Sequence, residues 1–145
     1  MPTFITPHFT LEEATYSDTA VRRDIPNKPT PAVWANMQAA ALHLEKVRDI
    51  TGPLHVNSWY RQPLVNQLVG GAKDSAHMTG FAIDCTSTDY TPYELCKMVI
   101  DSGIKFDQII LEFNRWMHIS FDPKMRQQVL SIFKPGMYQN GLIKP

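Results

Sequence analysis

The sequence lacks an excess of charge, a long apolar run and a leader-like start. Its 14 basic and 14 acidic residues balance, so it has no basic patch of the kind that marks nucleic-acid-binding proteins. No apolar run approaches the roughly 18 residues of a membrane-spanning helix. Residues 1–4 show no charged stretch leading into an apolar one, so we expect no signal peptide. Neither a nucleic acid nor a membrane is therefore an expected partner.

Cysteine is scarce, with Cys85 and Cys96 as the two occurrences. Two cysteines make no disulfide framework, and no CxxC pair suggests a structural metal site. A single disulfide between them is the alternative. We expect instead two buried reduced thiols, because free cysteine packs as a small apolar residue.

Apolar residues, by contrast, are plentiful enough for a folded core. They make up 43% of the chain, against 19% charged residues, a balance typical of globular rather than disordered proteins. A length of 145 residues suits one domain with a single core.

Helix signals are clearest at three capping sites. Residues 10–13 and 91–94 each form a capping box, in which a threonine and a glutamate cap the first turn. Thr30-Pro31 begins the strongest predicted helix, which ends at Gly52-Pro53. A short helix is expected over residues 64–68.

Strand signals dominate the second half. We expect strands over residues 54–60, 80–86, 107–112, 116–121 and 129–133. A tight connection at Asn114-Arg115 predicts a hairpin, whereas residues 1–9, with two prolines, should be irregular. Helices followed by closely linked strands favour an α+β fold, with N-terminal helices packed on a small antiparallel sheet, over a doubly wound parallel sheet.

The strongest chemical signal lies between Ser75 and Asp84. It combines His77, a carboxylate seven residues later at Asp84, and Gly80 between them, where a bend without a side chain would leave room for a metal. A second histidine, His118, lies in an apolar setting. Two histidines and one carboxylate leave one coordination position open, which is the pattern of a catalytic rather than a structural zinc site.

Three further side chains are candidates for the chemistry. Glu112, which a hairpin would bring near the metal, is our candidate proton shuttle; the alternative is a solvated glutamate at a strand end. Arg61 can bind a substrate carboxylate or a developing oxyanion, or form a structural salt bridge. Ser75 can bind substrate or orient His77, or only cap a turn.

These residues resemble the zinc peptidases of family M15, in its branch A, which includes D-alanyl-D-alanine carboxypeptidases and phage L-alanyl-D-glutamate endopeptidases. The pattern Ser-x-His-x-x-Gly-x-Ala-x-Asp is met in full from Ser75 to Asp84, and Trp116-Met117-His118 resembles the second histidine segment. Similarity to a small phage branch of the family extends from about Phe9 to Gln128.

The resemblance implies one Zn²⁺ held by His77, Asp84 and His118, a catalytic carboxylate at Glu112, and a substrate contact from Arg61. It also implies a single zinc peptidase domain over residues 1–145, with the fold of hedgehog signalling domains and D-alanyl-D-alanine peptidases. In hedgehog domains, too, a glutamate stands six residues before the last histidine.

The chain departs from the family pattern at two positions. Arg115 stands where some members carry an acidic residue, and Trp116 stands where others carry a histidine. Both lie just before the last histidine, so the identity of the catalytic base is the point that the resemblance leaves open.

We therefore expect a zinc metallopeptidase acting on peptidoglycan stem peptides, as a carboxypeptidase or an endopeptidase. A phage-encoded lytic enzyme fits, either released from the host cytoplasm to the cell wall or carried in the virion. The alternative is a non-catalytic zinc-containing phage structural or binding protein on the same scaffold.

Overall fold

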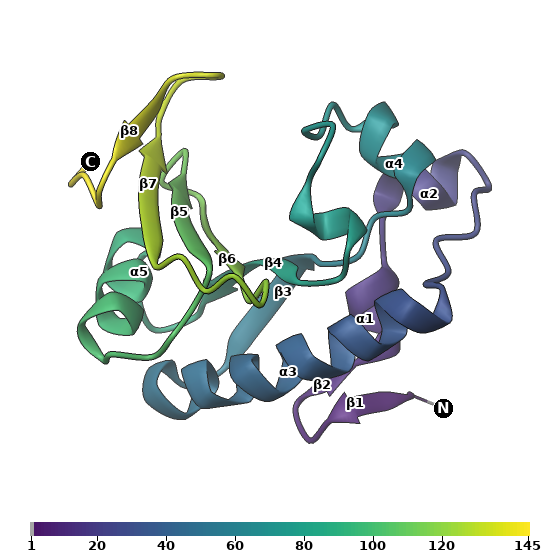
Figure 1. Ribbon diagram of the computed structural model, residues 1–145, viewed down its shortest axis with the longest axis horizontal. Helices are drawn as coiled ribbons and strands as arrows, with labels where there is room; N and C mark the ends of the chain where they lie inside the picture. Colours follow the sequence, from purple (N-terminus) through teal and green to yellow (C-terminus); the bar gives the residue numbers. More distant parts are fainter. Residues whose placement is uncertain (1) are drawn as a thin grey trace.

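The computed structural model describes residues 2–145 (Figure 1). The N-terminal half contains β1 (Phe4–Thr6), β2 (Phe9–Thr10), α1 (Leu11–Thr15), α2 (Asp18–Arg22), α3 (Pro31–Thr51), β3 (Leu54–Ser58) and α4 (Pro63–Leu68). The remainder contains the 3₁₀ helix η1 (Ala76–Met78), β4 (Ala82–Ser87), α5 (Pro92–Asp101), β5 (Gln108–Glu112), β6 (Trp116–Ser120), β7 (Gln128–Ile132) and β8 (Tyr138–Asn140). The predicted mixed α+β class is confirmed.

The predicted helix starts are confirmed. Both threonine–glutamate capping boxes form, at the beginnings of α1 and α5, and Thr30 caps α3 with Pro31 in its first turn. The apolar stripe of α3 is fully buried at Met37, Ala41, Leu44 and Val47. Local capping and periodicity therefore determined these helices.

The prediction of an irregular N-terminus is wrong. β1 and β2 form a small antiparallel sheet. The two prolines do not prevent it, because Pro2 precedes β1 and Pro7 lies in the turn between the strands. Phe9 anchors this sheet in the core, with its ring 6.2 Å from that of Trp59 in an edge-to-face arrangement.

The main sheet is larger than predicted and is not purely antiparallel. It has six strands in the order β3-β4-β6-β5-β7-β8, and β5 and β7 pair in parallel. After β6 the chain crosses to the far side of β5 and adds two more strands. An ion pair fixes this crossing: the Nε and Nη2 atoms of Arg126 each lie 2.9 Å from a carboxylate oxygen of the buried Asp107.

The layers leave one face of the sheet open. Helices α3 and α5 pack on the other face, while α4 and the strands β5 to β8 rise on opposite sides of the opening (Figure 1). Strand β4 pairs with the edge strand β3 on one side and with β6 on the other, and its Ile83 and Cys85 lie in the core. Asp84 between them must face the open side, because successive side chains of a strand alternate.

The two cysteines are free and buried, as predicted. Cys85 lies within β4 and Cys96 within α5. Burial raises the pKa of the Cys96 thiol to about 12 and raises that of Cys85 well above its usual range. Both thiols therefore stay protonated at neutral pH.

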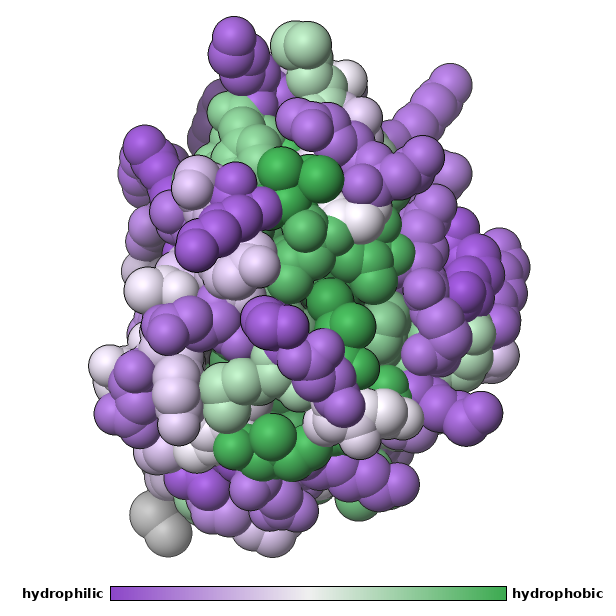
Figure 2. All heavy atoms as spheres, turned by 90° about the vertical axis from the view of Figure 1, so that its left-hand side faces the viewer, coloured by the Kyte–Doolittle hydropathy of each residue, from purple (hydrophilic) through white to green (hydrophobic). Residues whose placement is uncertain are grey.

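On the side of the molecule where α5, β7 and β8 lie, an apolar band crosses a surface that is otherwise largely polar (Figure 2). The C-terminal segment carries exposed apolar side chains at Met137, Tyr138 and Ile143. Among residues 2–145, no helix combines the length and apolarity needed to span a membrane.

Candidate metal centre and its cleft

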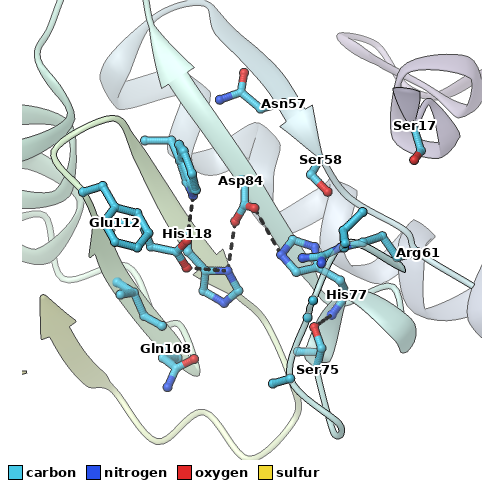
Figure 3. Close-up of a pocket in the computed structure, with 18 of the residues that line it drawn as sticks. Ser17, Asn57, Ser58, Arg61, Ser75, His77, Asp84, Gln108, Glu112 and His118 are labelled. Atoms are coloured by element: carbon cyan, nitrogen blue, oxygen red, sulfur yellow. Dashed lines mark hydrogen bonds and ion pairs between the residues drawn. The ribbon is translucent and has the colours of Figure 1, made fainter. Parts of the chain in front are cut away.

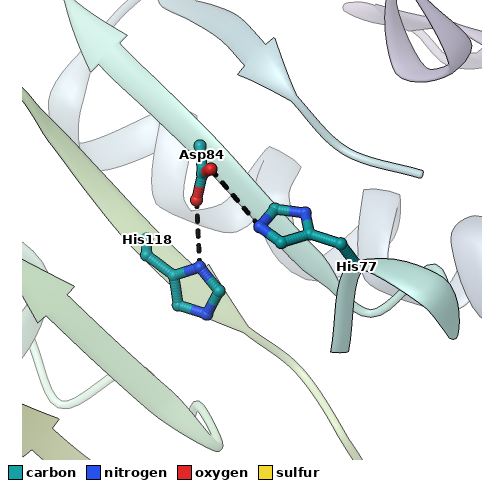
Figure 4. A group of neighbouring side chains, drawn as sticks. All are labelled: His77, Asp84 and His118. Atoms are coloured by element: carbon teal, nitrogen blue, oxygen red, sulfur yellow. Dashed lines mark hydrogen bonds and ion pairs between the residues drawn. The ribbon is translucent and has the colours of Figure 1, made fainter. Parts of the chain in front are cut away.

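The open face of the sheet brings the three predicted ligands together. Asp84 in β4 pairs with His118 in β6 in the antiparallel register, so their side chains emerge side by side. His77 reaches the same point from the 3₁₀ helix η1 (Figure 4). His118 lies 34 residues after Asp84 and is brought beside it only by the fold.

The geometry of this cluster suits a metal ion. The Nδ1 atom of His118 lies 2.9 Å from Oδ1 of Asp84, and Nε2 of His77 lies 3.3 Å from Oδ2. One ligand atom from each residue lies within 4.8 Å of the others, and all three residues are buried. Two imidazole nitrogens and a carboxylate oxygen are a donor set that zinc takes in catalytic sites.

The orientation of His77 is set by a backbone carbonyl. Its Nδ1 lies 2.7 Å from the carbonyl oxygen of Trp59, which can only accept, so Nδ1 carries the proton. The unprotonated Nε2 then faces Asp84. A hydrogen bond of this kind fixes the tautomer of a metal-ligating histidine.

Ser75 supports His77 from the other side. Its hydroxyl accepts a hydrogen bond from the backbone N–H of His77 at 3.2 Å and caps η1. The turn-capping alternative is therefore realised. Ser75 also lines the cleft described below, so its predicted contact with a substrate stays a prediction.

Burial and neighbouring charges together set the protonation state of each residue in the cluster. Burial would raise the pKa of Asp84, but its interactions with His77 and His118 hold it well below its usual range. Burial lowers the pKa of His77. Burial opposes protonation of His118 as well, but the hydrogen bond and charge of Asp84 outweigh it and raise that pKa. The cluster thus offers an ionised carboxylate and a neutral imidazole at neutral pH.

The structure places Glu112 beside this cluster (Figure 3). Its Oε1 lies 3.7 Å from Nδ1 of His118, and its Oε2 accepts a hydrogen bond of 3.0 Å from Nε1 of Trp116. Burial, reinforced by the charge of Asp84, raises the pKa of Glu112. Arg115, at the position where some M15 members carry an acidic residue, is exposed at the hairpin turn. Glu112 is thus better placed than residue 115 to act as a base.

Arg61 faces the same region from the end of β3 (Figure 3). Burial lowers the pKa of its guanidinium, while Asp84 and Glu112 oppose this effect. Within residues 2–145 its side chain forms no ion pair, and its Nε is buried without a hydrogen-bond partner. The structural salt bridge considered from the sequence is therefore absent there. A half-buried cation with an unpaired donor is suited to an anionic or carbonyl group.

The position of Arg61 depends on the absence of a side chain at Gly71. A Cβ atom added there would lie 2.8 Å from an Nη atom of Arg61 and would collide with Oδ1 of Asn66. Asn66 in turn holds the following loop through its hydrogen bond of 2.8 Å to the carbonyl of Ala72. Gly71 thus leaves the space in which the guanidinium lies.

We expect Gly71→Ala to raise KM for a cleaved peptide about tenfold, the effect of losing about 1.4 kcal/mol, because Arg61 must move. Gly103→Ala is the control, because Gly103 does not line the cleft. Its added Cβ meets nothing within 4 Å, although its φ of +79° makes alanine strained there. Gly103→Ala should therefore lower the melting temperature without raising KM, and equal KM values for the two variants would contradict this role of Gly71.

Gly80 forms the predicted bend, but the space it leaves serves another purpose than the one predicted. A Cβ atom at Gly80 would lie 2.8 Å from Met37 and 3.1 Å from Val33, both on α3, and its φ is +86°. The glycine therefore allows close packing on α3 rather than clearance for a metal. Its carbonyl accepts a hydrogen bond of 2.8 Å from the indole of Trp59.

The cluster lies in a cleft of about 860 Å³, a size in the range of small-molecule and peptide sites. The two walls differ in chemistry. One has small or polar side chains and comes from residues 17–19 and 70–72, and the other is largely apolar and aromatic: Ile110, Phe113, Trp116, Leu130 and Tyr138. A chain bound across the cleft would meet Arg61 and Glu112 at its centre.

Two contributions were missed from the sequence. Trp116 was given no role beyond its place in the second histidine segment and its departure from the family pattern, yet it donates a hydrogen bond to Glu112. Gly71 was given no role at the site, yet it makes room for Arg61. The adjacent glycines before the histidine motif were the available signal for the second; no local signal indicated the first.

Two histidines, an aspartate and a nearby carboxylate in a cleft are the constellation of a metal-dependent hydrolase. The family model described as Peptidase M15 matches residues 7–120. The chain therefore belongs to peptidase family M15, which confirms the resemblance seen in the sequence. No curated protein matches the chain.

Proposed function

We propose that this member of the M15 family is a zinc metallopeptidase that hydrolyses peptide bonds in peptidoglycan stem peptides. His77, Asp84 and His118 would hold one Zn²⁺. The observation that carries the proposal is the buried histidine–aspartate–histidine cluster with a carboxylate 3.7 Å from it. The donor types, their proximity and their burial all fit zinc.

Zinc, Glu112 and Arg61 would each have a separate role in hydrolysis. When bound, zinc supplies Lewis-acid activation of water and of the scissile carbonyl. Glu112 takes a proton from the attacking water and returns it to the leaving amine, for which a pKa raised by burial is favourable. Arg61 binds the carbonyl oxygen or a substrate carboxylate with its guanidinium, whose Nε has no hydrogen-bond partner.

Stem peptides suit this cleft because they carry carboxylates for Arg61 and short side chains for the small polar wall. A terminal carboxylate on Arg61 corresponds to a carboxypeptidase, and an internal one corresponds to an endopeptidase. A lytic role for a phage fits either product, with release from the host cytoplasm to the wall or carriage in the virion.

The test is mass spectrometry of the products from defined muropeptides and from purified peptidoglycan of several chemotypes. The zinc-loaded protein should release peptides with one consistent cut position, which identifies the activity. Removal of zinc by a chelator should abolish release, and added zinc should restore it.

Two results would overturn the proposal. A zinc-loaded protein that releases nothing from any wall chemotype would favour a non-catalytic phage structural or binding protein on this scaffold. Full activity after verified loss of the metal would exclude the metal mechanism.

A further inference from the structure

Trp116 and Glu112 form a side-chain pair at the end of the β5–β6 hairpin. They are direct partners in the register of the two strands, so their side chains leave the sheet on the same face. The indole Nε1 of Trp116 donates to Oε2 of Glu112 at 3.0 Å. An indole N–H can only donate a hydrogen bond, so Trp116 must be the donor and Glu112 the acceptor.

The two oxygens of Glu112 consequently have different surroundings. Oε2 is engaged by Trp116, whereas Oε1 lies 3.7 Å from Nδ1 of His118 and faces the cluster. The terminal torsion of a glutamate is intrinsically broad. Without the indole bond the carboxylate would rotate among several orientations.

The hairpin turn at Phe113 and Asn114 positions the indole of Trp116. Phe113 and Asn114 have φ values of +56° and +52°, a conformation that costs a phenylalanine about 1–3 kcal/mol and persists only where surroundings enforce it. The N–H of Phe113 donates to the carbonyl of Ile132 in β7 at 2.7 Å. Its ring then packs edge-on to Trp116, with centroids 6.1 Å apart.

We propose that Trp116 is the positioning residue of the catalytic base: its indole N–H, held by the strained Phe113 turn, fixes Oε2 of Glu112 so that Oε1 alone is presented to the metal cluster. This inference rests on the proposed function for its kinetic consequence. The hydrogen bond itself does not depend on that function, so the two can fail separately.

The first test is spectroscopic and needs no activity. The chain has three tryptophans, so a nitrogen–proton correlation spectrum should show three indole signals, and Trp116→Phe assigns one of them. Glu112→Gln should shift that signal, because a charged acceptor is replaced by a neutral one. The signals of Trp34 and Trp59 should stay in place. An unmoved Trp116 signal would overturn the proposal.

The second test is kinetic. Trp116→Phe keeps an aromatic ring beside Phe113 but removes the N–H donor. We expect kcat to fall about 10–100-fold, the usual effect of losing a partner that orients an active-site group. KM should stay within about twofold, because phenylalanine keeps an aromatic ring at the cleft wall that Trp116 lines. Zinc content should be unchanged, because no ligand is altered. Trp34→Phe, a matched change on α3, should leave both constants unchanged.

A double variant separates positioning from general damage. If Trp116 acts through Glu112, Trp116→Phe should have no further effect on kcat in a Glu112→Gln background. An equal fall in kcat in both backgrounds, or a wild-type kcat for Trp116→Phe alone, would overturn the proposal. If the wild type releases no peptide, the proposed function fails, and the indole spectrum still decides whether the hydrogen bond exists.

Discussion

An Asp84→Asn variant should lose bound zinc, and with it all measurable peptide release. The carboxamide keeps the size of the side chain but is neutral and a weak zinc ligand. Mutation of a residue that only orients a metal ligand lowers metal affinity about 10–100-fold. Removal of a ligand itself should therefore lower metal affinity by more than that. The measurement is zinc content after dialysis at equimolar metal, together with thermal unfolding with and without zinc.

The size of the thermal effect follows from mass action. Zinc at about 100 times its dissociation constant stabilises the native state by about 2.7 kcal/mol. Wild-type protein should show this as a zinc-dependent rise in melting temperature, and Asp84→Asn should show none. Without metal, the variant also removes the partner that raises the pKa of His118.

Asp107→Asn is the matched control, because Asp107 is an equally buried carboxylate whose partner is Arg126. It should be less stable than wild type by about 2 kcal/mol, since hydrogen bonds to a charged group are lost. Its zinc-dependent rise in melting temperature should remain. A zinc response retained by Asp84→Asn would remove Asp84 from the ligand set.

Glu112→Gln should lower kcat by about 10²–10⁴-fold, the usual contribution of a general base, with zinc content unchanged. The amide can still accept a hydrogen bond from Trp116, so the side chain keeps its place but cannot carry the proton. KM should change little, because binding is left intact. Initial rates with a defined muropeptide measure both constants.

Glu45→Gln offers a control of the same chemistry and similar exposure. The Glu45 side chain is 17% exposed and that of Glu112 is 19% exposed, but Glu45 pairs with His8. Its variant should retain the wild-type kcat. If Glu112→Gln also retains it, another group must serve as the base.

Local sequence signals predicted the helices well, because a cap such as Thr30 with Pro31 acts within one turn. Local signals did not predict strand pairing that depends on contacts between residues distant in sequence. The parallel pairing of β7 with β5 depends on the crossing held by Asp107 and Arg126. Nothing within residues 121–133 alone encodes that crossing, so the sheet was predicted too small and purely antiparallel.

The candidate site, too, was predicted from local sequence only in part. The motif from Ser75 to Asp84 indicated its residues, but the pairing of Asp84 with His118 comes only from the register of β4 and β6. The hairpin turn was predicted at Asn114-Arg115, which would pair Phe113 with Trp116. The observed connection spans residues 113–115 and pairs Glu112 with Trp116 instead. A phenylalanine at positive φ is too uncommon to be anticipated.

The alternation along β4 has a consequence for metal selectivity. Asp84 faces the cleft while Cys85, the next residue, faces the core, so a thiol lies one residue from a candidate metal ligand yet on the opposite side of the strand. Thiolates favour soft ions such as copper(I), whereas imidazole and carboxylate do not. Because the Cys85 sulfur is buried on the core side of β4, neither competing soft metal ions nor oxidants in the solvent can reach it.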